Sequence, residues 1–120
     1  MTRHRHRPRA LVVLLAALLA VGLAGCGTEN SYGLAARACN HISRSIQLYE
    51  QSVKQTDPAR AHALASQALA QLRVAMPLAT EAAADDGSWQ AMMTTLSESS
   101  RVPESHLITA LKDQCEAVNS

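Results

Sequence analysis

The chain has 120 residues, enough for one domain, and a formal net charge of +1. Four of its arginines precede residue 10, so from residue 26 onward seven basic side chains stand against ten acidic ones, a net charge of −3. A mildly acidic domain without clustered Lys and Arg argues against binding to nucleic acid, because contacts to phosphates need clustered positive charge.

The first 25 residues combine a basic start with a short apolar run. Residues 1–9 carry four arginines and no acid, and residues 10–25 consist only of Ala, Leu, Val and Gly. A membrane-spanning helix needs about 20 apolar residues, so this run is too short to be one. A basic start, a short apolar stretch and small residues at its end are typical of a secretory signal peptide.

Four residues at the end of the apolar run carry a family resemblance. Leu23-Ala24-Gly25-Cys26 resembles the lipobox of bacterial lipoproteins: an aliphatic residue, two small residues and a cysteine. The resemblance implies that a peptidase removes residues 1–25 and that Cys26 receives a diacylglycerol. It also implies that the new amino group is often acylated, for example with palmitate. Two or more acyl chains give stable membrane anchoring. Ordinary secretion, with Cys26 left free, is the alternative.

Residues 26–30 would then form a tether between the lipid and the folded part. An extended chain spans at most about 3.6 Å per residue, so a domain that starts at Ser31 sits within roughly 20 Å of the membrane. The expected location is the outer face of the plasma membrane, in the cell envelope. The alanine-rich composition of the chain also resembles that of small helical lipoproteins of actinobacteria.

Two long helices are expected first. Apolar residues recur at alternating steps of four and three over residues 31–55, the spacing of one helix face. Asp57 and Pro58 suit the cap and first position of a second helix, which runs into the 80s. Pro77 predicts a kink inside it or a break near Met76, because proline removes a backbone hydrogen bond. The apolar faces are Ala35, Cys39, Ile42, Ile46, Tyr49 and Val53 on the first helix, and Leu64, Ala68, Leu72, Ala75 and Ala79 on the second.

Two shorter helices are expected to follow. Asp85-Asp86-Gly87-Ser88 predicts a stop and restart, in which the glycine is left-handed and the serine caps the third helix. A polar link over residues 97–102 precedes a fourth helix, which Pro103 and Glu104 open. The apolar faces are Trp89, Met92, Met93 and Leu96 on the third helix, and Leu107, Ile108, Leu111, Cys115 and Val118 on the fourth.

The fold class that these patterns predict is all-α. No run of alternating apolar and polar residues indicates a strand. Short links favour antiparallel neighbours, hence a small antiparallel bundle of about four helices over residues 31–120. Its core lacks Phe and is rich in Ala. Because alanine buries little area, a covalent crosslink would help so small a domain.

Cys39 and Cys115 could supply that crosslink. They remain when the lipidated Cys26 is set aside, and the compartment outside the plasma membrane permits disulfides. In an up-down bundle the start of the first helix and the end of the fourth lie at the same end, which would bring the two cysteines together. The alternative is two buried thiols that never meet.

Other candidates for chemistry are weaker. His41, His62 and His106 fall on three helices and could share a metal, but none belongs to a ligand motif such as HExxH. The hydroxyls of residues 94–100 lack the glycine-flanked elbow of a serine hydrolase, and Asp85-Asp86-Gly87 lacks the spaced ligands of a calcium loop. We therefore predict no catalytic residue, no metal and no other cofactor.

Trp89, Met92 and Met93 form an apolar cluster with two interpretations. Trp is enriched at binding hot spots and Met at adaptable surfaces, so the cluster could contact a partner. Apolar residues at helical spacing are more often core, and we favour the core.

Together these features predict a membrane-anchored, non-enzymatic helical module that binds another protein of the cell envelope. A carrier or sensor of a small apolar ligand is the alternative, and it requires a closed apolar cavity of roughly some hundreds of Å³. A metal-dependent enzyme that uses the three histidines is a further one.

Overall fold

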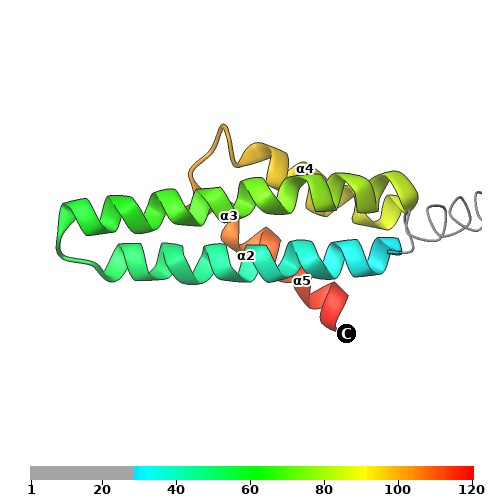
Figure 1. The fold of residues 1–120 in the computed structure, drawn as a ribbon, viewed down its shortest axis with the longest axis horizontal. Helices are drawn as coiled ribbons and strands as arrows, with labels where there is room; N and C mark the ends of the chain where they lie inside the picture. Colours follow the sequence, from blue (N-terminus) through cyan, green and yellow to red (C-terminus); the bar gives the residue numbers. More distant parts are fainter. Residues whose placement is uncertain (1–28) are drawn as a thin grey trace, which may run out of the picture.

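The computed structural model describes residues 29–120, and the lipobox with Cys26 lies outside them. Four helices and two short 3-10 helices make up this part: α2 (Ser31–Lys54), α3 (Pro58–Asp85), η1 (Gly87–Trp89), α4 (Gln90–Glu98), η2 (Glu104–His106) and α5 (Ile108–Asn119). From residue 29 to the end there is no strand, which confirms the all-α bundle (Figure 1). None of the described helices is both long and apolar enough to cross a membrane.

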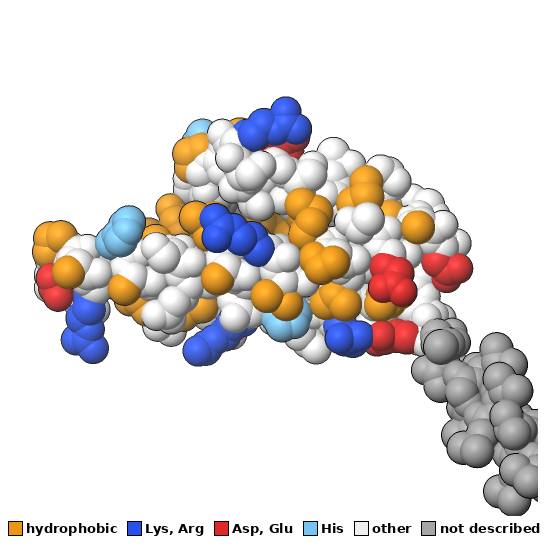
Figure 2. All heavy atoms as spheres, turned by 45° about the horizontal axis from the view of Figure 1, so that its top comes forward, with side chains coloured by type: hydrophobic (Ala, Val, Ile, Leu, Met, Phe, Trp, Pro, Cys, Tyr) orange, Lys and Arg blue, Asp and Glu red, His pale blue; other side chains and the backbone are white. Residues whose placement is uncertain are grey.

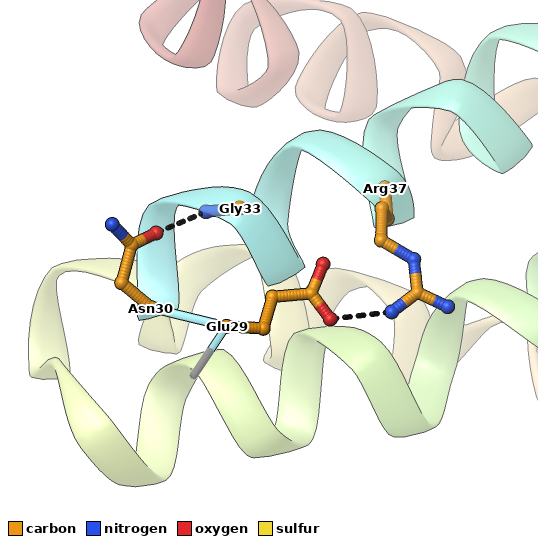
Figure 3. Close-up of polar contacts among 4 residues, drawn as sticks. All are labelled: Glu29, Asn30, Gly33 and Arg37. Carbon is orange, nitrogen blue, oxygen red and sulfur yellow. Dashed lines mark hydrogen bonds and ion pairs between the residues drawn. The ribbon is translucent and has the colours of Figure 1, made fainter. Parts of the chain in front are cut away.

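α2 begins at a cap that the close-up in Figure 3 shows. The side-chain oxygen of Asn30 accepts a hydrogen bond from the Gly33 amide at 2.8 Å. Arg37, on the second turn, pairs with Glu29 at 2.5 Å. An N-cap of this kind stabilises a helix by about 1 kcal/mol, because it satisfies one of the free amides of the first turn. Both contacts therefore hold the first residues that the structure describes against α2.

α3 begins as predicted and continues where a break was expected. The Asp57 carboxylate accepts from the amide of Ala59, the second residue of the helix, at 3.3 Å, and Pro58 occupies the first position. The helix then runs through Pro77 to its end, so the break expected near Met76 is wrong. Pro77 faces solvent, while Ala75 and Ala79 beside it are fully buried. Packing of that buried face keeps the helix continuous although one hydrogen bond is lost.

The turn after α3 differs from the sequence-based expectation. Asp86, and not Ser88, is the cap: its carboxylate accepts from the Ser88 amide at 3.0 Å, and its carbonyl accepts from the Trp89 amide at 3.2 Å. Gly87 lies within this 3-10 turn and is not left-handed. The hydrogen bonds from Ser88 lower the pKa of the Asp86 carboxyl. Because the Asp86 side chain reaches the amide two residues later directly, the turn closes without a residue in the left-handed conformation.

The molecule divides into two parts, which we call the base and the tip. The tip is residues 51–67, the end of the α2–α3 hairpin that projects to the left in Figure 1. The base is residues 29–50 and 68–120, where α4 doubles back along α3 and α5 packs across α2. Every residue of the apolar core lies in the base: Leu34, Ala35, Ala38, Cys39, Ile42, Ile46, Leu72, Ala75, Ala79, Ala82, Met92, Leu96, Leu107, Leu111, Cys115 and Val118. In the tip only Ser52 is buried.

Candidate functional site

A disulfide joins the first and last helices of the base. Cys39 of α2 and Cys115 of α5 are bonded, with Cα atoms 5.5 Å apart and a separation of 76 residues in the chain. Both cysteines are buried in the core. The pairing predicted from the sequence is confirmed, and two separate thiols are ruled out. The bond is structural, because it fixes α5 to α2 from inside the core.

The cluster of Trp89, Met92 and Met93 packs in the base. Met92 is 1% exposed, so it is a core residue and leaves no surface for a partner. Trp89 and Met93 are half-buried against the same core. The Trp89 ring meets the exposed ring of Tyr32 edge to face, with centroids 6.3 Å apart. The Tyr32 hydroxyl donates to the Val118 carbonyl at 2.5 Å, so these residues close the end of the base.

The three histidines are not brought together. His41 of α2 shares a hydrogen bond of 2.8 Å between its Nδ1 and Oε1 of Gln71 on α3, which ties the two long helices. His62 lies exposed in the tip, and His106 lies exposed on η2. Within residues 29–120 no three His, Cys, Asp or Glu side chains are placed to hold a metal ion. The three histidines therefore do not form the shared metal site that a metal-dependent enzyme would need from them.

Four of the five hydroxyls of residues 94–100 donate to the backbone of their own segment. Thr94 and Thr95 donate to the carbonyls four residues earlier, at 2.9 and 3.0 Å. Ser97 and Ser100 donate to the carbonyls three residues earlier, at 2.6 and 3.2 Å. Each of these hydroxyl protons is thus held by the backbone, as expected for a helix end and its link.

A buried polar contact at the edge of the base was missed by the sequence reasoning. Ser45 of α2 is 0% exposed and Glu104 of η2 is 5% exposed. The Ser45 hydroxyl oxygen lies 2.6 Å from the Ala68 carbonyl and 2.6 Å from Oε1 of Glu104. We expected Glu104 to open the fourth helix, but it lies in η2, and α5 begins at Ile108. The one available signal was Ser45 itself, which falls between two residues of the apolar face, Ile42 and Ile46.

A shallow hollow of about 490 Å³ lies against the tip. Five of its seven lining residues have long polar side chains, and two of these, Lys54 and Arg60, are positively charged. It is open to solvent, so it differs from the closed apolar cavity that a carrier of an apolar ligand requires. The residues that line it are Gln51, Lys54, Gln55, Arg60, Ala63, Leu64 and Gln67.

Charge is distributed unevenly between the two ends. Acidic side chains gather where the described chain begins, at the right in Figure 2. In the tip, Lys54 and Arg60 outnumber the single acid, Asp57. The acidic end comprises Glu29, Glu81, Asp85 and Asp86, three of which lie on or beside the last turns of α3.

Comparisons with protein-family models, with curated proteins and with solved structures find no match to this chain.

Proposed function

We propose that this chain is a membrane-anchored lipoprotein of the cell envelope, lipidated at Cys26, that binds a partner protein through the tip and catalyses no reaction. The observation that carries the proposal is the opposite placement of two ends. The described chain begins at the base, and the tip lies at the far end of the hairpin (Figure 1). An anchor on Cys26 would therefore hold the base and leave the tip free.

The length of the hairpin supports this orientation. Only two residues separate Cys26 from Glu29, so the lipid and the base would be neighbours. α2 has 24 residues, and at a rise of 1.5 Å per residue it spans roughly 36 Å. The tip would then reach on the order of 40 Å from the membrane.

The surface of the tip also suits a protein contact. Val53 is 67% exposed, and Gln51 and Lys54 lie beside it on the same end of α2. An apolar side chain ringed by polar ones has the anatomy of a small interface, with an apolar centre and a polar rim. Because almost nothing in the tip is buried, packing in the core does not restrict which side chains the surface of the tip can carry.

The anchor is tested by replacing the cysteine. Cys26→Ser should move the protein from the membrane fraction to the soluble fraction, because the thiol that accepts the lipid is gone. Thr28→Ala, two residues further on, is the matched control and should stay with the membrane. Circular dichroism should show the same helix content for both variants. A Cys26→Ser protein that stays with the membrane after a carbonate wash, or that no longer folds, would contradict the proposal.

The partner is tested by site-specific photo-crosslinking in intact cells. A crosslinking amino acid at position 53 in the tip should trap one defined envelope protein. The matched control is position 74 on α3, since Val74 is also exposed, at 47%, but lies in the base. Repeated absence of a product from position 53, or the same product from both positions, would count against a tip-specific contact.

A further inference from the structure

The contact among Ser45, Ala68 and Glu104 contains more acceptors than protons. A serine hydroxyl has one proton, and a backbone carbonyl has none to give. Two oxygens lie 2.6 Å from the Ser45 hydroxyl oxygen, one on Ala68 and one on Glu104. If Glu104 were ionised, one of these two short oxygen–oxygen contacts would have no proton between its atoms.

A neutral Glu104 resolves the count. Its carboxylic acid then donates to the Ser45 oxygen, and Ser45 donates to the Ala68 carbonyl, so each contact holds one proton. This chain of donors runs from η2 through α2 to α3. It therefore fastens the link between α4 and α5 to both long helices.

No charged side chain lines the hollow in which the Glu104 carboxyl sits. From α2 the lining residue is Tyr49. α3 contributes Ala65 and Leu69, and the link contributes Ser99, Val102 and Pro103.

The charged residues near the link in sequence are engaged elsewhere or exposed. Arg101 pairs with Glu98 at 3.6 Å on the surface, and His106 is exposed. Burial accordingly raises the pKa of the Glu104 carboxyl, and the hydrogen bond with Ser45 opposes this in part.

We propose that Glu104 is a proton-controlled latch that holds the link between α4 and α5 on the hairpin. In the closed state the neutral acid donates to Ser45. When its proton passes to water, the carboxylate has no ion-pair partner among the described residues, and the one proton of Ser45 is shared with the Ala68 carbonyl. The link around η2 then leaves the hairpin and uncovers the surface beside the tip. The disulfide keeps α5 attached to α2 throughout, so the opening is confined to the link.

The expected pH dependence follows from the direction of the shift. Below the ordinary carboxyl pKa of 4.5, both the closed and the open state are protonated and the latch is at its tightest. Above it the open state loses its proton first, so the opening equilibrium rises about tenfold per pH unit. The opening equilibrium constant stops rising at the raised pKa of the closed state, and above that pH it no longer depends on pH.

Amide hydrogen exchange of the full chain in detergent, followed by mass spectrometry between pH 4 and 8, tests the latch. After correction for intrinsic exchange, residues 101–107 should lose protection as the pH rises, while the core of the base stays protected. Glu104→Gln keeps a donor and cannot ionise, so it should remove this pH dependence. Glu116→Gln, on an exposed carboxyl of α5, is the control and should keep it.

Carboxyl carbon NMR of the wild-type chain provides a measurement that needs no variant. The Glu104 resonance should titrate above 4.5. Titration at or below that value, or equal pH dependence of exchange in the wild type and Glu104→Gln, would overturn the latch.

Discussion

The base and the tip are built from the same two helices, yet they are held in different ways. In the base, α4, α5 and a disulfide cover the hairpin, and Ile42, Leu72 and Leu111 are 0% exposed. In the tip, Ser52 is the one buried residue. Isolated helices are marginal in water, so the tip owes its order to the continuity of α2 and α3 with the base. Stability and a free surface are thus placed at opposite ends of one hairpin.

The largest effect should come from removing the disulfide of the base. The bond closes a loop of 76 residues, and in the chain-entropy model its loss costs about 4–5 kcal/mol. Cys39→Ser with Cys115→Ser should lower the free energy of unfolding by that amount, measured by denaturant titration. Val53→Ala in the tip should leave it unchanged. A loss below about 1 kcal/mol would mean that the alanine-rich core already holds the base without the bond.

A paired leucine truncation sharpens the comparison next. Leu72 of the base is 0% exposed, so Leu72→Ala should cost about 2–5 kcal/mol through lost burial and a cavity. Leu64 in the tip is half-buried, and the same truncation there should cost about 1 kcal/mol, because less area leaves water. Thermal unfolding of the two variants measures the difference. Equal losses would show that the tip is as well packed as the base.

Removal of a helix cap should have a smaller and more local effect. Asp57→Ala deletes the side chain that holds an amide at the start of α3, at a cost of about 1 kcal/mol. Hydrogen exchange should quicken over residues 51–67 and stay unchanged in the core of the base. Asn30→Ala removes the corresponding cap of α2 and should quicken exchange at the base end instead. Uniform loss of protection in either variant would contradict the division into two parts.

Local rules account for the elements, and tertiary packing accounts for what they missed. Helical spacing and Asp57 with its proline place the two long helices, and cysteine counting with up-down topology predicts the bridge from Cys39. Propensity alone could not foresee that packing carries α3 through Pro77. Propensity also could not show that α4 and α5 leave the tip uncovered. That depends on where along α2 and α3 the two short helices pack, which is set by tertiary contacts.

The buried carboxyl illustrates a different limit of the sequence. Acidic residues are normal in the first turn of a helix and are normally exposed, so Glu104 reads as a surface residue. Its burial depends on Ser45, which lies 59 residues earlier in the chain. No local pattern links a serine on one helix to an acid that follows a distant link. The one local sign is a serine within an apolar face.

The smallest effect should come from the ion pair that crosses the edge of the base. Lys112 of α5 lies 3.5 Å from Glu50 of α2, and about half of each side chain is exposed. Solvent screens such a pair, so Lys112→Ala should lower the free energy of unfolding by no more than about 0.5 kcal/mol. Asp113→Ala, on the neighbouring exposed carboxyl, is the matched control, and both are measured at low and high salt. If Lys112→Ala cost about 2 kcal/mol, surface charge would be a main contribution to the packing of α5 on the hairpin. The disulfide and the buried side chain of Leu111 would then contribute less to that packing than their burial indicates.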